Sequence, residues 1–466
     1  MRCCCWRTRR RCARVGPSAW RSTGSSFVSV VMRVAFAVPF FGPGLTNGSE
    51  HLAYHLARRL VELGAAVDVY TTCTARARAV APFALRWPAD FPAAPEVSAG
   101  IRIRRFPVTF AMPAALARLA STLIAARWRA EERRYGVVLK GSAALETYYA
   151  RRARSRPAWY DQVFLAGLGP WSAPLRRELE LRLPDYDVVV TGFVPFALPG
   201  QVIRLTRRLG KPAALLPLFH PEDLFHHHRT FYEMFAEASA VLALTGYSAG
   251  LFRRLAPASR PIELGAGVEA EAYSRADISG ARFRARYGLG DDDLVLFVGR
   301  KEPGKRYDLA VAAVERLARP GTTLVMVGED VDRAPLRSAR TRHLGKIPLE
   351  DLRDAYDACR VLLAPSEHES FGMVLLEAWM REKPVIGNGR CRPLASLIDE
   401  GRDGFVSWTA DDMAERLRLL LDQPELARQM GQRGRQKVLR QYTWEVVGRK
   451  LFDILGELAA PHAGRA

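Results

Sequence analysis

A short apolar run, a glycine-bearing loop and an amphipathic helix follow one another twice in this chain, and this pattern limits its fold. The first unit has a strand at Arg33–Val38, a loop over 39–47 and a helix from Gly48, for which we expect Ser49 to be the N-cap. The second has a strand at Leu294–Val298, a loop over 299–305 and a helix over 307–317. Alternating strands and helices predict two successive α/β halves of Rossmann type, each with a parallel sheet.

One stretch of the second half places two carboxylates beside a helix start. The apolar run Val361–Ala364 predicts a buried strand, a loop containing Glu369 follows, and a helix containing Glu377 begins near Gly372. Such a turn gathers unpaired backbone N–H groups and the positive end of a helix dipole, which suit an anion. Ionised carboxylates accept hydrogen bonds from hydroxyl groups. A phosphate beside hydroxyls indicates a sugar nucleotide.

Two cations occupy the first loop of the same half. Arg300 and Lys305 follow the strand Leu294–Val298 and suit a diphosphate, because arginine can chelate two oxygens and lysine adds a point charge. Alone, they would be interpreted as solvated cations of a surface loop. The acid-bearing loop in the same half favours a site. Asp291–Asp293 precede the strand, at the wrong end for this site, and we expect no metal.

These motifs resemble the donor-binding signature of the family 4 retaining glycosyltransferases, the glycosyl transferases group 1. The resemblance rests on Gly299-Arg300-x4-Lys305 and on Glu369-x7-Glu377 within Pro-Ser-x2-Glu-x-Phe-Gly-x4-Glu-Ala. It covers roughly 260–455, and 32–260 more weakly. It implies an α/β GT-B fold, with two Rossmann-like domains facing each other across a cleft, and a hexosyltransferase that retains the anomeric configuration. The donor would be a GDP- or UDP-linked sugar, with no cofactor and no metal.

The resemblance also implies a role for each matching residue. Cations would hold the diphosphate and stabilise the leaving group, carboxylates would accept from the ribose and donor sugar, and backbone N–H groups would contact sugar or phosphate. The implied catalytic residues are Glu369, His220, Arg300 and Lys305. The implied donor-binding residues are Arg300, Lys305, Ser370, Phe371, Gly372, Glu377 (ribose) and Gly48. The sequence alone leaves Asn47-Gly48 open between a ligand-binding loop and a plain tight turn.

We expect four segments along the chain. Residues 1–31 form a basic disordered extension, 32–268 an acceptor-binding domain with an insertion over 79–135, 269–443 a donor-binding domain, and a helix over about 444–460 that crosses back. The polar run 269–290 is expected to be the linker between the halves. Residues 1–31 hold seven arginines and no acidic residue. An upstream start before Met32, a targeting sequence and a nucleic-acid arm are the alternatives for them.

The net charge of +20 implies an anionic partner. A helix is expected over 114–135, with Leu116, Leu119, Leu123 and Ile124 on one side and five arginines (118, 127, 129, 133, 134) around it. It could lie on an anionic membrane, or its charges could form a solvated face. We expect a nucleotide sugar and a sugar or lipid-linked acceptor as partners, and no nucleic acid. Scattered cysteines and the lack of a membrane span predict a cytoplasmic protein, peripheral on the inner face of the membrane.

Four histidines follow the expected strand Ala213–Leu218. His220 stands where open α/β sheets bind ligands, whereas His226, His227 and His228 are expected in a surface loop. Three consecutive histidines cannot face one way, so a metal cluster is not expected there. Two other functions remain open at this stage. One is a sugar-nucleotide epimerase of the same fold, and the other is a basic nucleic-acid-binding protein.

Overall fold

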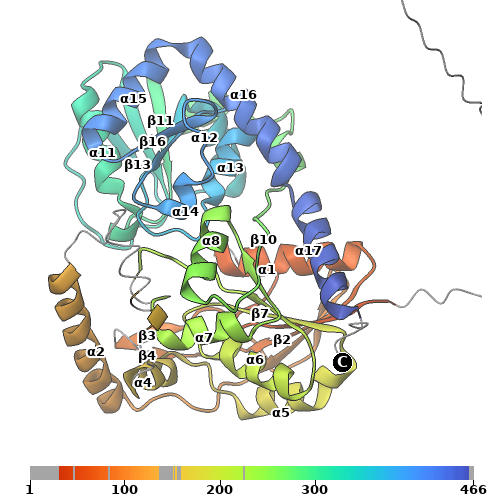
Figure 1. Cartoon of the computed structure of the whole chain (residues 1–466). Coiled ribbons are helices and arrows are strands. Elements are labelled where there is room, and N and C mark those ends of the chain that lie inside the picture. Colours follow the sequence, from red (N-terminus) through yellow and green to blue (C-terminus); the bar gives the residue numbers. More distant parts are fainter. Residues whose placement is uncertain are drawn as a thin grey trace, which may run out of the picture. The chain divides into compact units, whose positions relative to one another are not determined.

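The computed structural model describes residues 31–45, 48–81, 84–135, 151, 153–154, 159–223 and 226–460 (Figure 1). The expectations for residues 1–30, the extension, and for Asn47 lie outside the described residues. Within the described part of the chain, no helix combines the length and apolarity needed to cross a membrane.

An eight-stranded sheet dominates the first half. Its spatial order is β10-β9-β8-β7-β1-β2-β6-β5, and every neighbouring pair is parallel except β5 and β6. The strands are β1 (Arg33–Ala37), β2 (Ala66–Thr72), β5 (Glu96–Ser98), β6 (Ile101–Phe106), β7 (Val188–Gly192), β8 (Ala213–Leu216), β9 (Ala240–Ala243) and β10 (Pro261–Glu263). Its central strands are nearly continuous apolar runs, as expected for parallel strands covered on both faces.

Helices cover this sheet on both faces. They are α1 (Gly48–Glu62), α4 (Trp159–Leu168), α5 (Ala173–Arg182), α6 (Leu198–Arg208), α7 (Arg229–Glu237) and α8 (Gly246–Leu255). The side of α1 that carries Leu52, Leu56 and Leu60 is buried against the sheet. The prediction that Ser49 is the N-cap is wrong. The helix begins at Gly48, and the Ser49 hydroxyl donates to the carboxylate of Glu50 at 2.7 Å.

The insertion contributes a hairpin and a long helix. Strands β3 (Arg78–Ala81) and β4 (Ala84–Arg86) pair antiparallel, and α2 (Ala114–Tyr135) packs on them and on α4. The expected bounds of α2 are confirmed. Ile124 is buried, whereas Leu116, Leu119 and Leu123 are 47–58% exposed. The helix turns the side bearing Ala120 and Ile124 toward its neighbours.

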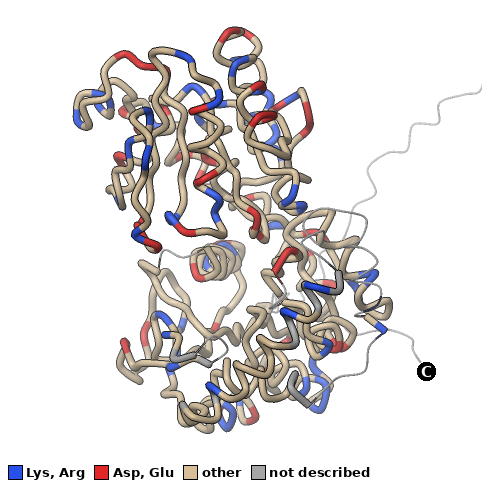
Figure 2. Tube along the Cα trace, turned by 90° about the vertical axis from the view of Figure 1, so that its left-hand side faces the viewer, with Lys and Arg blue, Asp and Glu red and all other residues tan. Residues whose placement is uncertain are grey.

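A six-stranded parallel sheet forms the second half, in the order β13-β12-β11-β14-β15-β16. Its strands are β11 (Asp293–Val298), β12 (Thr322–Val327), β13 (Thr341–His343), β14 (Val361–Ala364), β15 (Val385–Asn388) and β16 (Gly404–Ser407). Its helices are α11 (Tyr307–Leu317), α12 (Leu349–Ala358), α13 (Met373–Met380), α14 (Arg392–Ala395), α15 (Ala410–Asp422) and α16 (Pro424–Gln441). Figure 2 shows Lys and Arg on both halves, with Asp and Glu between them.

The polar run 269–290 is not a plain linker, so that prediction is corrected. It contains α9 (Ala270–Tyr273) and α10 (Gly280–Tyr287), and α10 packs against α12. Phe283 and Tyr273 are buried. Few apolar residues are sufficient to attach this run, because a pair of hydrogen bonds also holds it to α12. The Arg282 guanidinium donates to the two carboxylate oxygens of Asp354 at 2.7 and 2.9 Å.

The last helix, α17 (Trp444–Ala459), returns to the first half as expected and packs along α1. Arg59 of α1 pairs with Glu445, and the His55 ring stacks on Trp444 with centroids 4.7 Å apart. A Cβ at Gly448 would reach the side chain of Arg59, so glycine permits this close approach.

Candidate functional site

Lys305 and Glu369 meet at one edge of the second sheet. Strands β11 and β14 are parallel neighbours, so the loops at their carboxyl ends lie side by side. Lys305 ends a short 3-10 turn, Pro303–Lys305, and Glu369 lies in the loop before α13. The Lys305 ammonium donates to Glu369 Oε1 at 2.6 Å. Side chains placed by separate loops therefore form one ion pair.

Glu369 is ionised in this setting. Burial by itself would raise the pKa of its carboxyl, but the ammonium of the neighbouring Lys305 brings the pKa below its usual value. An ionised carboxylate has only acceptor sites, and Lys305 occupies one of them. Glu369 keeps further lone pairs to accept hydrogen bonds from hydroxyl groups.

His220 reaches this ion pair from the first half of the chain, in the loop after β8. Burial lowers the pKa of His220, although the charge of Glu369 acts in the opposite direction. Its backbone N–H donates to Nδ1 of His226 at 2.8 Å, which fixes the loop. His220 is consequently a neutral imidazole close to Glu369. The sequence predicted both residues but not that they would be neighbours.

The expectation of a surface loop for the three consecutive histidines is wrong. His226, His227 and His228 are at most 5% exposed. His227 uses both ring nitrogens, toward the Tyr232 hydroxyl at 2.6 Å and the Pro221 carbonyl at 2.7 Å, and His228 stacks on Phe164. Neutral, hydrogen-bonded imidazoles can be buried at modest cost. Among the described residues, no group of three or more His, Cys, Asp or Glu could hold a metal ion.

The start of α13 presents free backbone N–H groups. Gly372 precedes the helix with φ +123°, a conformation that favours glycine. Phe371 is buried against Tyr442, which orients the turn, and Ser370 is partly buried beside it. Within the described part of the chain, the N–H groups of Phe371, Gly372 and Met373 have no hydrogen-bond acceptor. They form a place for an anion or a hydroxyl oxygen.

Glu377 lies one turn further along α13 and is held by tyrosines. The Tyr356 hydroxyl donates to its Oε2, and the Tyr273 hydroxyl lies nearby. Burial raises the pKa of Glu377, against the effect of these two hydroxyls. The tyrosines were not predicted, because they come from α9 and α12, far away in sequence.

Among the described residues, Arg300 and Gly48 make no hydrogen bond or ion pair with Lys305 or Glu369. Arg300 is half exposed and its guanidinium pairs with Glu302 at 2.8 Å. Gly48 is exposed at the first residue of α1, and a Cβ there would meet no described residue within 4 Å. The space around Gly48 is open, as the predicted approach of a ligand requires. The structure thus brings together only some of the predicted site residues.

Glu222 is a site residue that sequence reasoning missed. Its Oε1 accepts the backbone N–H of Arg392, at the start of α14 in the second half, at 3.0 Å. Among the described residues, its other oxygen is buried without a hydrogen-bond partner. Burial raises its pKa to about 8. The only signal in the sequence is its place two residues after His220.

The comparisons with known proteins agree with this architecture. The family model described as "Glycosyl transferases group 1" matches residues 281–437, which include Lys305, Glu369 and Glu377. Solved structures with the same fold include Anabaena Alr3699/HepE in complex with UDP and glucose (TM-score 0.61, 15% identity, 91% of this chain and 100% of that chain). Sucrose-phosphate synthase from Thermosynechococcus elongatus has a TM-score of 0.60 at 18% identity, covering 92% and 99%. The fold is GT-B.

Three curated relatives are similar in sequence. Alpha-D-kanosaminyltransferase of Streptomyces kanamyceticus is 28% identical over 261 residues, 51% of this chain and 67% of the relative. The GDP-mannose-dependent alpha-(1-6)-phosphatidylinositol monomannoside mannosyltransferase of Mycolicibacterium smegmatis is 29% identical, covering 47% and 62%. The D-inositol 3-phosphate glycosyltransferase of Saccharomonospora viridis is 26% identical, covering 92% and 94%. The chain spans about two thirds of the length of the first two. The family match and these names indicate a transferase enzyme.

Proposed function

We propose that this group 1 glycosyltransferase belongs to the family 4 retaining enzymes and moves a hexose from a GDP- or UDP-linked donor to an acceptor. The observation that carries the proposal is the Lys305–Glu369 ion pair beside the free N–H groups of α13, with the neutral His220 next to it. Cation, carboxylate and helix start are the complement of a sugar attached to a diphosphate. The proposal needs neither a metal nor a cofactor other than the donor.

Each group has a task in this proposal. Lysine has three N–H donors, so Lys305 can keep its hydrogen bond to Glu369 and still donate to a phosphate oxygen as charge builds on the leaving group. Arg300 binds the diphosphate by giving up its ion pair with Glu302 and pairing with phosphate oxygens instead. Glu369 accepts a hydrogen bond from the donor sugar. The anomeric bond to phosphate breaks while the acceptor hydroxyl oxygen bonds on the same face, and the hydroxyl proton passes to the leaving nucleoside diphosphate.

Ribose binding is assigned to Glu377, whose remaining acceptor sites can receive the ribose hydroxyls while Tyr356 holds its Oε2. Ser370, Phe371 and Gly372 offer backbone N–H groups to sugar or phosphate oxygens. Gly48 leaves space for phosphates or acceptor at the start of α1. His220 is placed to hydrogen-bond a hydroxyl of the reacting sugar.

The acceptor is proposed to be a sugar or a lipid-linked molecule at an anionic membrane surface. Relatives named for a phosphatidylinositol monomannoside and for an inositol phosphate support an anionic acceptor. The exposed leucines of α2 adjoin exposed arginines at 118, 129 and 133, an arrangement that suits peripheral contact with anionic lipid. Vesicle sedimentation tests this part, and equal binding to neutral and anionic vesicles would contradict it.

Replacement of Glu369 by alanine tests the proposal. We expect Glu369→Ala to keep the fold and to abolish transfer, while Glu415→Ala, an exposed glutamate of α15, keeps both. Unchanged turnover of Glu369→Ala would refute the assignment. Product analysis with and without acceptor separates transfer from epimerisation.

The donor base is identified by a thermal-shift panel of nucleoside diphosphates. A ligand at a hundredfold excess over its Kd stabilises the folded protein by about 2.7 kcal/mol, so a bound diphosphate gives a clear shift. Relatives and structures named for GDP-mannose and for UDP make GDP and UDP the first two to compare.

A further inference from the structure

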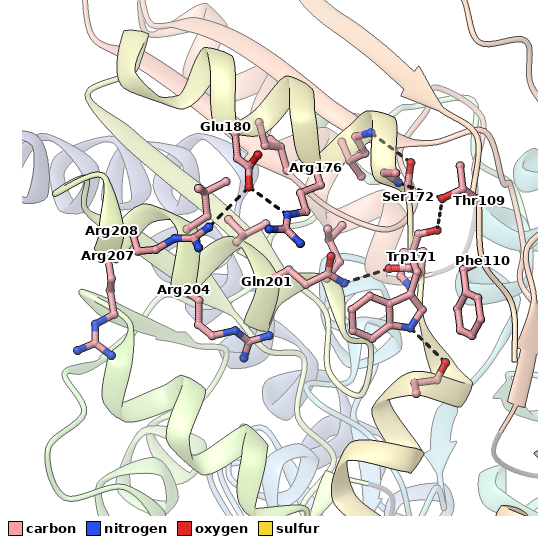
Figure 3. Close-up of a pocket in the computed structure, with 18 residues that line it drawn as sticks. Thr109, Phe110, Trp171, Ser172, Arg176, Glu180, Gln201, Arg204, Arg207 and Arg208 are labelled. Carbon is pink, nitrogen blue, oxygen red and sulfur yellow. Dashed lines mark hydrogen bonds and ion pairs between the residues drawn. The ribbon is translucent and has the colours of Figure 1, made fainter.

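A groove in the first half lies outside the donor site. A cavity of about 970 Å³ opens between α5 and α6 (Figure 3). Its floor consists of side chains that are at most 5% exposed: Leu175, Leu179, Leu198, Val202 and Leu205. This volume is at the upper end of the range typical of small-molecule sites. The groove is therefore large enough for a ligand and apolar along its length.

Arginines line one end of the groove. Arg176 on α5 and Arg204, Arg207 and Arg208 on α6 stand there against one acid, Glu180 (Figure 3). Glu180 accepts from Arg176 at 3.0 Å and lies 3.7 Å from Arg208. Arg207 pairs with Glu237 at 3.0 Å, whereas Arg204 has no ion-pair partner among the described residues. This end carries an excess of positive charge.

The other end is aromatic, and its polar atoms are already hydrogen-bonded. Phe110 and Trp171 lie there, away from the arginines (Figure 3). The Trp171 indole N–H donates to the Ala166 carbonyl at 3.1 Å, and the Gln201 amide donates to the Pro170 carbonyl at 3.2 Å. The Ser172 hydroxyl donates to a backbone carbonyl at 2.7 Å and accepts from the backbone of α5. Few polar groups remain to recognise a nucleobase or a sugar, so hydrocarbon fits this end best.

We propose that this groove binds an anionic phospholipid. The phosphate lies among Arg176, Arg204 and Arg208, where guanidinium groups can each give two hydrogen bonds to phosphate oxygens. One acyl chain follows the apolar floor toward Trp171. Phe110, half exposed, stands just before α2, whose leucines are also exposed, so the groove ends close to an apolar surface of the same half. The proposal is independent of the transferase activity, because none of these residues belongs to the donor site.

Calorimetric titration with dihexanoylphosphatidylglycerol, kept below its micellar concentration, tests the proposal on the full chain. Dihexanoylphosphatidylcholine tests the contribution of the acyl chains alone, and inorganic phosphate tests that of the anion alone. We expect phosphatidylglycerol to bind about tenfold or more tightly than either, because a phosphate–arginine hydrogen bond and chain burial both contribute. Equal affinity for phosphate alone, or for phosphatidylcholine, would overturn the proposal.

Variants locate the site. Arg204→Ala combined with Arg208→Ala should weaken binding about tenfold or more, and Ala173→Trp, at an exposed position lining the groove, should block the apolar end. Arg177→Ala is the matched control, because Arg177 is an exposed neighbour that does not line the groove. All variants should keep the wild-type thermal midpoint and the shift with nucleoside diphosphate. Unchanged lipid affinity in both groove variants would overturn the proposal.

A second readout depends on Trp171 itself. A phosphatidylglycerol brominated on its acyl chain should quench tryptophan fluorescence on binding, and Trp171→Phe should remove most of that quenching while binding persists. Quenching that survives Trp171→Phe would place the chain elsewhere and overturn the proposal. A failure of lipid to bind at all, for instance because another segment of this chain fills the groove, would do the same.

Discussion

Replacing Glu222 by glutamine isolates the cost of burying one carboxyl between the two halves of the chain. Glu222 is 9% exposed, its Oε1 accepts from the Arg392 backbone, and its Oε2 has no hydrogen-bond partner in the part of the chain that the structure describes. Burial raises its pKa from the ordinary 4.5 to about 8, with the charge of Asp223 acting in the same direction and Arg392 opposing it. At neutral pH the folded protein therefore holds a proton on Glu222 that the unfolded chain releases.

The sign of the pH dependence follows from this difference. Between pH 4.5 and about 8 the folded state binds one more proton than the unfolded state, so the free energy of unfolding falls as pH rises. The slope is about 1.4 kcal/mol per pH unit, and the whole window is worth about 5 kcal/mol. Below pH 4.5 and above pH 8 the contribution is level. Glutamine does not titrate, so the Glu222→Gln variant lacks this dependence of the unfolding free energy on pH. Its amide oxygen can still accept the hydrogen bond from the Arg392 backbone.

Urea unfolding followed by tryptophan fluorescence at pH 5.5, 6.5, 7.5 and 8.5 measures the difference. We expect Glu222→Gln to gain about 1.4 kcal/mol per unit relative to the wild type up to about pH 8. Glu415→Gln, at an exposed glutamate without an ion-pair partner among the described residues, should run parallel to the wild type. Parallel curves for Glu222→Gln and the wild type would refute the raised pKa.

Two further substitutions test local packing by the free energy of unfolding. Arg306→Gly should lower the free energy of unfolding by about 2 kcal/mol. Glycine adopts the left-handed backbone of this position (φ +50°) without strain, which gains about 1–2 kcal/mol. The loss of the ion pair between Arg306 and the buried Glu367 costs about 3–5 kcal/mol. Gly434→Ala should destabilise by about 2 kcal/mol or more, because the added methyl group would overlap the buried indole of Trp379.

Each of these substitutions has a matched control in the chain. Arg333 is also left-handed, with φ +54°, but its side chain makes no ion pair among the described residues, so Arg333→Gly should be neutral or stabilising. Gly456, inside α17, has open space where a Cβ would stand, and Gly456→Ala should stabilise by about 0.5–1 kcal/mol. Equal effects in a test variant and its control would contradict the contacts named above.

The parts of the site that sequence reasoning predicted are those set by local order along the chain. Lys305 and Glu369 each follow a short apolar run, and parallel strands bring their carboxyl ends to one edge. The pairing of β11 with β14 then places the two residues in contact. The same reasoning placed His220 after β8, because that strand also ends at a ligand-binding edge.

What sequence reasoning missed depends on which surfaces meet. Glu222 becomes a buried acid only because Arg392, 170 positions away, approaches it. The periodicity of α2 showed a leucine side but not that its neighbours would cover the side with Ile124. The three histidines looked polar and exposed, yet His227 is fully satisfied by two local partners. Partners from other elements, not composition, decide these outcomes.

The contacts of Tyr273 determine where the two halves can move relative to each other. Arg381 donates to the backbone carbonyl of Tyr273 at 2.9 Å, and the Tyr273 ring packs against that of Tyr356, so α9 is attached to the second half. A rotation of the two halves relative to each other must therefore occur at residues that precede α9 in the chain. Gly265 has φ +89°, and the backbone N–H of Val268 donates to the Tyr442 carbonyl at 2.9 Å, so two chain segments cross together there. We expect the hinge at Gly265 and at the contact between Val268 and Tyr442. A rotation there leaves the surroundings of Glu377 unchanged, while His220 and Glu222 move relative to Glu369.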